Sequence, residues 1–228
     1  MSVYLVGAKN PETRRQVLAQ QAADPTFVVG GFIDNDPAKA GTTFLGSPVL
    51  GGIDVIDQLL IDDPDARFVT LISGSTDARY EVSRDLAAKG CRFTNLIHPD
   101  VDLTDVTLGT GNYIQNGVIV QAAVHIGDNV GLHFRSLVSH ETSIGHSAFV
   151  GPGATIAGEV EIGDGSFIGA GATVIPRVRI GRWATVGAGA VVITDVPDHA
   201  TVVGNPARVI RVDAPTHLDG AILGLTDD

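Results

Sequence analysis

Aliphatic residues recur at every sixth position through the second half of the chain. From Leu108 to Val192 each sixth residue is Leu, Ile or Val, which gives fifteen consecutive positions in one register. Alternate residues of a strand share a face, so these residues and the mostly small residues two positions earlier are predicted to point inward. Many of the aliphatic positions are followed directly by glycine, which we expect to adopt the positive φ of a sharp corner: Gly109, Gly127, Gly145, Gly151, Gly163, Gly169, Gly181 and Gly187. Strands and corners at this period predict a parallel β-helix of hexapeptides.

The first hundred residues follow a different pattern. Apolar strand candidates at 3–7, 26–34, 68–73 and 93–97 alternate with helical candidates at 11–23, 53–61 and 77–90. This order predicts a small parallel, Rossmann-like βαβ unit, whose ligands bind beyond the carboxyl ends of the strands. Gly7, Asp34 and Gly74 stand at those ends. Asp34 can accept hydrogen bonds from a ribose hydroxyl, although Asp is also common in turns.

The two patterns predict an α/β domain at 1–100, a β-helix domain at 101–212 and a C-terminal tail at 213–228. The formal charge of −11 disfavours nucleic acid and anionic lipid as partners. We find neither an apolar run of membrane-spanning length nor a basic and apolar leader, so we expect a cytoplasmic protein without a membrane partner. "GAKNPE" has one glycine and lacks the dinucleotide fingerprint, so NAD is not expected. The single cysteine, Cys91, is predicted to be buried.

The segment "VSHETSIGHS" (138–147) places polar residues within this aliphatic repeat. His140 follows the inward Val138 by two residues, so it should project outward from a corner. Positions 18 apart lie one strand spacing from each other. His140 would therefore lie between Ala122 and Gly158, with open space around its ring. This arrangement indicates a pocket, and the alternative is an ordinary surface histidine.

These motifs resemble the hexapeptide-repeat acyltransferases. "SHETSIG", the following "GPGATIAGEVEIGDGSFIGAGATVIPRVRIG" and the terminal "GNPAR" are similar to the branch that contains UDP-4-amino-sugar N-acetyltransferases and sialic acid O-acetyltransferases. The resemblance implies five left-handed coils of 18 residues, a homotrimer, acetyl-CoA as co-substrate and no metal. It also implies that His140 is the general base and that Glu141 increases its basicity.

The resemblance implies further site residues, and some of them depart from the family pattern. "GAKNP" replaces the usual glycine-rich sugar-nucleotide loop, His133-Phe134 replaces an asparagine-threonine pair, and Phe149 replaces a histidine. The residues expected to bind acetyl-CoA are Phe149, Gly158, Ala170, Ala188, Asn205 and Pro206. The residues expected to bind the sugar nucleotide are Lys9, Asn10, Pro11, Asp34, Asn35, Gly74 and His133.

The function that we expect is acetyl-CoA-dependent N-acetylation of a nucleotide-linked amino sugar, a step in polysaccharide biosynthesis. Sugar O-acetylation of the sialic acid type and a non-catalytic nucleotide-sugar-binding trimer are the alternatives. Hexapeptide β-helices also include trimeric carbonic anhydrases with zinc bound by histidines, so the fold by itself does not exclude a metal. A trimer would cover outward corners such as those of Phe149 and Trp183, and it would form each site from two chains.

Overall fold

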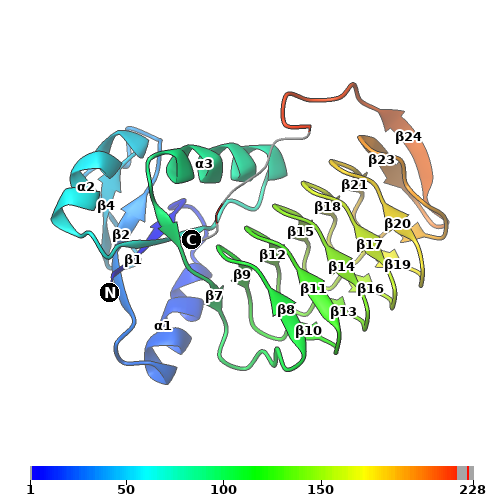
Figure 1. Cartoon of the computed structure of the whole chain (residues 1–228), viewed down its shortest axis with the longest axis horizontal. Coiled ribbons are helices and arrows are strands. Elements are labelled where there is room, and N and C mark those ends of the chain that lie inside the picture. The colour runs from blue at the N-terminus through cyan, green and yellow to red at the C-terminus, as the bar shows by residue number, and fades with distance from the viewer. Residues whose placement is uncertain (1, 220–224, 226–228) are drawn as a thin grey trace.

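The computed structural model describes residues 2–219 and 225, which form an α/β domain and a β-helix lying side by side (Figure 1). The first domain has a six-stranded sheet in the order β3-β4-β2-β1-β5-β6. Its strands are β1 (Ser2–Val6), β2 (Val28–Ile33), β3 (Thr43–Phe44), β4 (Ser47–Gly51), β5 (Arg67–Thr70) and β6 (Arg92–Phe93), and its helices are α1 (Thr13–Ala23), η1 (Ile53–Val55), α2 (Ile56–Asp62) and α3 (Thr76–Ala88). The predicted parallel α/β unit is confirmed, because β1 pairs in parallel with β2 and with β5.

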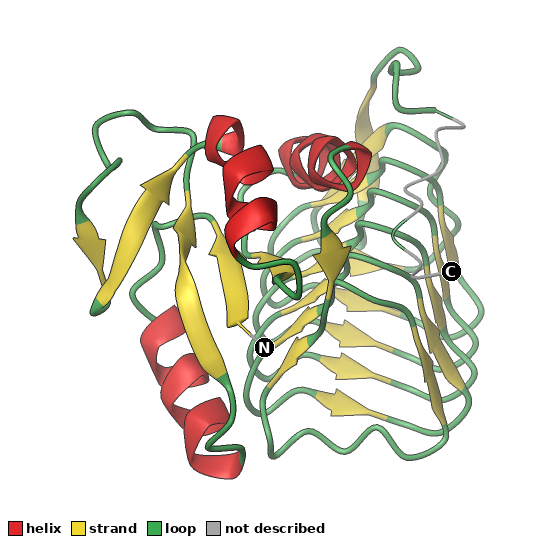
Figure 2. Ribbon diagram, turned by 60° about the vertical axis from the view of Figure 1, so that its left-hand side comes forward, coloured by secondary structure: helices red, strands yellow, loops and turns green. Residues whose placement is uncertain are grey.

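The β-helix domain has the predicted hexapeptide register. Strands 18 residues apart pair in parallel, as Phe149 does with Phe167, and the strands of successive coils lie above one another (Figure 2). Fifteen short strands form three faces: β8 (Val106–Leu108), β11 (Val124–Ile126), β14 (Ser143–Ile144), β17 (Glu161–Ile162) and β20 (Arg179–Ile180) on one; β9 (Tyr113–Ile114), β12 (Gly131–Leu132), β15 (Phe149–Val150), β18 (Phe167–Ile168) and β21 (Thr185–Val186) on the second; and β10 (Ile119–Val120), β13 (Leu137–Val138), β16 (Thr155–Ile156), β19 (Thr173–Val174) and β22 (Val191–Val192) on the third. The left-handed β-helix of hexapeptide repeats is confirmed.

The prediction about the corner glycines was wrong. Positive φ falls three residues after each aliphatic position from Leu108 to Val186, for example at Asn129 (φ 57°) and Glu141 (φ 57°). The glycines directly after the aliphatic positions meet a different constraint. A Cβ on Gly169 would lie 2.8 Å from the carbonyl oxygen of Val186 in the next coil. Close approach of neighbouring backbones therefore requires glycine there.

Three edges separate the faces, and each is defined by one row of corner residues. The His140 edge carries Ala122, His140, Gly158 and Pro176, the α3 edge carries Asp128, His146, Asp164 and Arg182, and the Ala170 edge carries Asn116, Phe134, Pro152, Ala170 and Ala188. His140 and His146 therefore lie on different edges, as predicted.

The chain enters the β-helix before residue 100. The strand predicted at 93–97 is two strands, because Phe93 ends β6 in the first sheet whereas β7 (Leu96–Ile97) pairs with β9 of the β-helix. The side chain of Asn95 between them donates to the carbonyl oxygen of Gly109 at 2.9 Å. The passage from one domain to the other is thus short and hydrogen-bonded.

Arg79 of α3 joins the two domains from the inside. Its Nε donates to the carbonyl oxygen of Asn129 at 2.6 Å, and its Nη1 donates to the carbonyl oxygens of Thr70 at 2.7 Å and Ile72 at 3.1 Å. Only 1% of Arg79 is exposed, and this burial lowers the pKa of the guanidinium to about 9. The carboxyl end of β5 and the α3 edge are thereby held together.

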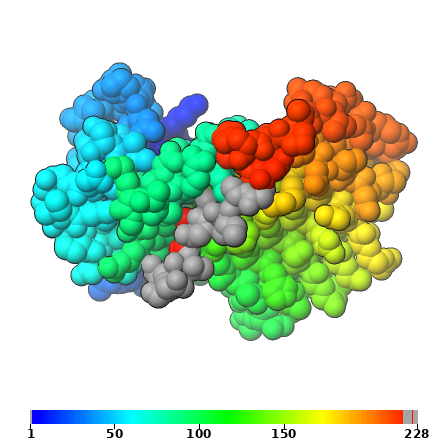
Figure 3. Space-filling view, turned by 45° about the horizontal axis from the view of Figure 1, so that its top comes forward, coloured from blue at the N-terminus to red at the C-terminus, as the bar shows by residue number. Residues whose placement is uncertain are grey.

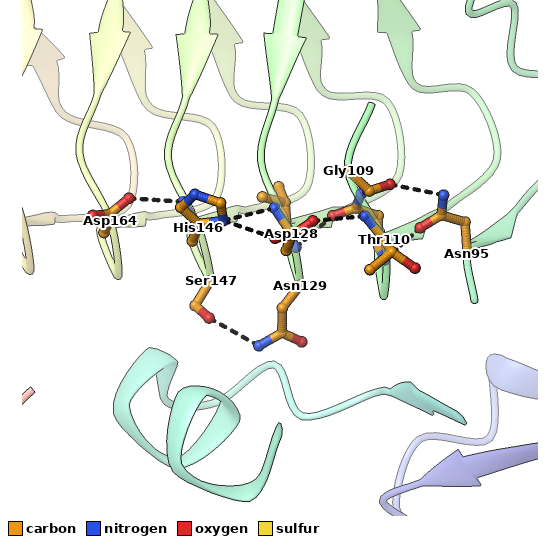
Figure 4. A network of polar contacts seen from close by, with 10 residues as sticks. Asn95, Gly109, Thr110, Asp128, Asn129, His146, Ser147 and Asp164 are labelled. Atoms are coloured by element: carbon orange, nitrogen blue, oxygen red, sulfur yellow. Dashed lines mark hydrogen bonds and ion pairs between the residues drawn. The ribbon is translucent and has the colours of Figure 1, made fainter. Parts of the chain in front are cut away.

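Polar side chains link successive coils along the α3 edge (Figure 4). The Asp128 carboxylate accepts the N–H of Thr110 at 2.8 Å, and the Asp164 carboxylate accepts the N–H of His146 at 2.9 Å. His146 Nδ1 lies 3.2 Å from the Asp128 carboxylate, and this contact raises the pKa of the imidazole. Asn129, bonded to Ser147 at 2.9 Å, points with it toward α3 in Figure 4.

The C-terminal segment returns over the junction of the two domains (Figure 3). After the antiparallel pair β23 (Ala200–Val203) and β24 (Arg208–Val212), His217 contacts Glu81 of α3 at 2.9 Å. Leu218 packs in one cluster with Trp183 and Tyr80. Trp183 is only 9% exposed within one chain, so the expectation that its corner needs a neighbouring subunit for cover was wrong. Residues 220–224 and 226–228 of the predicted tail lie outside the described residues.

Candidate active site

A cavity of about 700 Å³ opens at the carboxyl edge of the first sheet. The loop after β1, the end of β2 and the segment after β5 meet there, as expected for a parallel sheet. Six of the seven residues predicted to bind the sugar nucleotide line this cavity: Lys9, Asn10, Pro11, Asp34, Asn35 and Gly74. These six residues therefore meet in one cavity, and their contact with a sugar nucleotide stays a prediction.

Asp34 organises this cavity through three hydrogen bonds. Its carboxylate accepts the N–H of Ala8 at 2.8 Å, the N–H of Asp36 at 3.0 Å and the ammonium of Lys39 at 2.7 Å. Burial opposes ionisation of Asp34, but the bonds to Lys39 and the two amides lower the pKa of the carboxyl group overall. Asp34 is thus a fixed carboxylate that holds the loop after β1 and orients Lys39.

Lys39 was not among the predicted site residues. It stands in the turn "DNDPAKAG", where no motif singles it out, yet it lines the same cavity as Lys9. Two ammonium groups thus line one cavity, that of Lys9 and that of Lys39, which is paired with Asp34 at 2.7 Å. The spacing could have indicated it, because Lys39 follows the strand-end Asp34 by five residues and can reach back to its carboxylate.

His140 projects from its edge, as predicted. Its imidazole is 55% exposed, and Nδ1 lies 3.0 Å from the Glu141 carboxylate. The Gln121 side chain accepts the backbone N–H of His140 at 3.0 Å. With Nδ1 directed at a carboxylate, the other ring nitrogen, Nε2, is left to act on a substrate proton.

Gly158 lies directly against the His140 ring. A Cβ built on Gly158 would come within 2.7 Å of both Cε1 and Nε2, so only glycine leaves the imidazole in this position. Among the residues that the structure describes, the Gly158 N–H has no hydrogen-bond acceptor. A base nitrogen and an available N–H donor therefore stand next to each other. In the row one residue later along the chain, which contains Glu141, Glu159 and Arg177, Arg177 pairs with Glu159 at 3.4 Å. The Glu141 carboxylate pairs with His140 instead.

The remaining residues predicted to bind acetyl-CoA lie elsewhere. Ala170 and Ala188 are on the Ala170 edge. The N–H of Val191 donates to the carbonyl oxygen of Gly204, and the carbonyl oxygen of Val191 accepts the N–H of Ala207. Asn205 and Pro206, which lie between Gly204 and Ala207, are therefore also close to the Ala170 edge. One chain thus does not bring these four residues to His140 and Gly158.

His133 and Phe149 are interior residues of a single chain. His133 is 6% exposed and Phe149 5%, with ring centroids 4.5 Å apart, and Phe149 stacks on Phe167 at 4.7 Å. His133 does not line the cavity of Lys9, and burial lowers the pKa of its imidazole to about 4. The His133 ring thus lies in an aromatic row away from that cavity, and its contact with the sugar nucleotide stays a prediction.

Comparisons with known proteins agree with this geometry. The sequence matches the bacterial transferase hexapeptide family (six repeats) over residues 141–176 and 159–194. PerB from Caulobacter crescentus, solved with CoA and GDP-perosamine, is 31% identical, with 92% of this chain and 97% of that chain covered and a TM-score of 0.80. This chain belongs to the hexapeptide-repeat sugar acyltransferases.

Two further solved structures are similar to this chain. The acetyltransferase domain of PglB from Neisseria gonorrhoeae, in complex with acetyl coenzyme A, is 29% identical over 92% of this chain and 98% of that chain, with a TM-score of 0.77. WeeI from Acinetobacter baumannii is 26% identical over 92% of this chain and 100% of that chain, with a TM-score of 0.78. A search among curated protein sequences returned no match.

For a sugar acyltransferase, the site of this single chain is divided. The cavity of about 700 Å³ that Lys9 and Lys39 line, the Lys39 cavity, lies in the first domain. His140 projects from an edge of the β-helix other than the one that contacts α3. Within residues 2–219 and at 225, we found no group of three His, Cys, Asp or Glu residues placed to hold a metal ion. In that same part of the chain, no helix is long and apolar enough to cross a membrane.

Proposed function

We propose that this chain is an acetyl-CoA-dependent N-acetyltransferase that acts on a nucleotide-linked amino sugar. The observation that carries the proposal is the pairing of His140, held at Nδ1 by Glu141, with the unbonded N–H of Gly158. The Lys39 cavity would hold the nucleotide of the acceptor. The similar structures with CoA, GDP-perosamine and acetyl coenzyme A support both substrate classes.

The chemistry needs no covalent enzyme intermediate. The acceptor amine attacks the thioester carbonyl carbon while His140 Nε2 removes a proton from the nitrogen. The carbonyl oxygen becomes an oxyanion, to which the Gly158 N–H can donate. Collapse of the tetrahedral intermediate breaks the C–S bond, CoA leaves as thiolate and takes up a proton, and the amide is the product.

We further propose a homotrimer in which each site is formed by two chains. The outward residues of the β10-β13-β16-β19-β22 face carry no charge: Ile119, Leu137, Thr155, Thr173 and Val191. This face lies between the His140 edge and the Ala170 edge. A cyclic arrangement through it would bring His140 and Gly158 of one chain to Ala170 and Ala188 of the next.

The test of the function is the His140→Ala variant. General-base catalysis contributes about 10²- to 10⁴-fold, so kcat should fall by at least about 100-fold while the melting temperature and the oligomeric state are retained. His125→Ala is the matched control, because His125 is an exposed histidine of the same β-helix on another face. Normal turnover by His140→Ala would reject the assignment.

A non-catalytic sugar-binding protein would behave differently. It would have no reason to keep an acetyl-CoA groove, so isothermal titration with acetyl-CoA separates the two functions. Thermal shift with UDP-, GDP-, dTDP- and CMP-linked sugars identifies the nucleotide, since a ligand that binds the native state raises Tm. Binding of a nucleotide sugar without any binding of acetyl-CoA would favour the non-catalytic alternative.

A further inference from the structure

Thr142 is a buried residue that connects the coil of His140 to the corner of Gly158. It directly follows the His140-Glu141 pair in the chain, and its exposed fraction is 0%. Its hydroxyl donates to the carbonyl oxygen of Ala157 in the next coil at 3.0 Å. We propose that Thr142 is a positioning residue that orients the N–H of Gly158 for the oxyanion, an inference that rests on the proposed function.

The Thr142 hydroxyl takes the place of a backbone bond in the corner that carries Gly158. Residues 157–160 form a turn there, and such turns are often closed by a bond from the last N–H to the first carbonyl oxygen. Within the described part of the chain, Val160 and Ala157 do not make this bond. Instead, the hydroxyl accepts the Val160 N–H at 3.4 Å and donates to Ala157 at 3.0 Å. One side chain thus holds both ends of the turn.

The bond to Ala157 fixes the direction of the Gly158 N–H, because the Ala157 carbonyl and this N–H belong to one peptide unit. A peptide is planar and trans, so its carbonyl oxygen and its N–H point in opposite directions. With the oxygen bonded to a buried side chain, the N–H is directed away from the interior, at the corner where the His140 ring lies. Among the described residues, no backbone N–H donates to Ala157. Thr142 is therefore the contact that sets this direction.

The same bond strengthens the Gly158 N–H as a donor. A hydrogen bond to the carbonyl oxygen of a peptide increases the polarisation of its N–H, and the effect is larger in a buried environment of low dielectric. Without the hydroxyl, Ala157 and Val160 are free to bond each other, and closing the turn in this way would rotate the peptide. An oxyanion donor stabilises the transition state only when it is fixed before the reaction.

Ser166 makes the same bond at a corner without a base. Its hydroxyl, also 0% exposed, donates to the carbonyl oxygen of Gly181 at 2.7 Å, and both this bond and that of Thr142 span 15 residues. The N–H of the peptide unit there belongs to Arg182 and donates to the Asp198 carboxylate at 2.8 Å. The bond at Ser166 therefore leaves no N–H for a ligand, which makes Ser166 the matched control.

The test is the steady-state kinetics of Thr142→Ala in the full-length protein. The substrates are acetyl-CoA and GDP-perosamine or a UDP-linked 4-amino sugar, whichever the wild type acetylates. The fold accepts alanine at the equivalent position of other hexads, for example at Ala148 and Ala154. We expect kcat to fall by about tenfold, less than the 10²- to 10³-fold of a deleted oxyanion donor, with an unchanged KM for acetyl-CoA. Thr142→Ser keeps the hydroxyl and should restore most of kcat.

Two controls separate positioning from stability and from the base. Ser166→Ala should lower Tm about as much as Thr142→Ala but leave kcat at the wild-type value. In the His140→Ala protein, Thr142→Ala should lower the residual rate by about a further tenfold, because an oxyanion donor acts without the base. No further loss there would mean that Thr142 acts through His140 and would overturn the inference.

The failure of this inference can be told apart from failure of the proposed function. Wild-type kcat for Thr142→Ala, an equal fall in kcat for Ser166→Ala, or no recovery in Thr142→Ser would each overturn the role of Thr142. The proposed function would still stand on the loss of activity in His140→Ala. A wild type that acetylates no nucleotide-linked amino sugar would reject the proposed function and the role of Thr142 together.

Discussion

Gly158 makes room for His140, and this role can be tested apart from fold stability. Gly158→Ala adds a Cβ that would lie 2.7 Å from the imidazole Nε2, so the ring must turn away. A misplacement of about 1 Å can cost about 100-fold in rate, and we expect a fall of that size in kcat with a nearly unchanged melting temperature.

The control for Gly158→Ala is the double variant with His140→Ala. If the methyl group acts only by displacing the imidazole, it should have no further effect on the residual rate once the ring is absent. An additional loss of equal size in the double variant would show that Gly158 acts independently of His140.

The buried imidazole of His133 should make the stability of the fold depend on pH, because protonating it inside the protein is unfavourable. Burial and the charge of Arg79 lower the pKa of His133 to about 4, whereas an unfolded chain has a value of about 6.5. The unfolded state binds the extra proton first, so stability is lost as the pH falls from about 6.5 to about 4. Between pH 7 and pH 5 the free energy of unfolding should fall by about 2 kcal/mol from this group alone.

Urea unfolding of the wild type and of His133→Leu at both pH values measures this contribution. The difference between the two proteins in their pH dependence should be about 2 kcal/mol. Parallel pH profiles for the two proteins would contradict the assignment of this acid sensitivity to His133.

At the scale of elements, the sequence predicted what depends on periodic burial. Fifteen aliphatic positions in one register could only be buried together by stacked coils, and the order of the first domain followed from alternating apolar segments. The β3–β4 hairpin was missed, because residues 43–51, "TFLGSPVLG", form short strands without periodicity, of which β3 is at the edge of the sheet. The break between β6 and β7 was missed because both halves are apolar and only Asn95, bonded across to Gly109, marks the change of sheet.

Only the part of the candidate site that follows from the repeat or from strand ends could be predicted from the sequence. His140, Gly158 and the six cavity residues follow from counting in the repeat or from strand ends. Lys39 did not, because no motif marks it within its turn, although its partner Asp34 is only five residues away. The burial of His133 and Phe149 within one chain was not foreseen, because outward positions of a β-helix are exposed only where no other row covers them. Here Tyr113, His133, Phe149 and Phe167 form an aromatic layer.

For the whole molecule, the divided site predicts which pairs of inactive chains can restore activity when mixed. In the proposed trimer, the nucleotide cavity of one chain serves His140 of its neighbour. A His140→Ala chain mixed equally with a Lys39→Ala chain then forms interfaces in which one chain supplies an intact cavity and the other an intact His140. About one quarter of the interfaces should be of this kind if assembly is random, so about a quarter of wild-type turnover should return.

A second mixture is the internal control. Because Gly158 lies against the His140 of its own chain, mixing His140→Ala with a chain carrying a bulky residue at Gly158 leaves no interface with a working base, and activity should stay absent. Both mixtures must be refolded or co-expressed together and must sediment as trimers. Rescue in the Gly158 mixture would mean that this glycine serves a neighbouring His140, and failure of the Lys39 mixture would contradict a site shared between the cavity of one chain and His140 of the next. A monomer at micromolar concentration would reject the shared site altogether, since the cavity and His140 would then have no means of meeting.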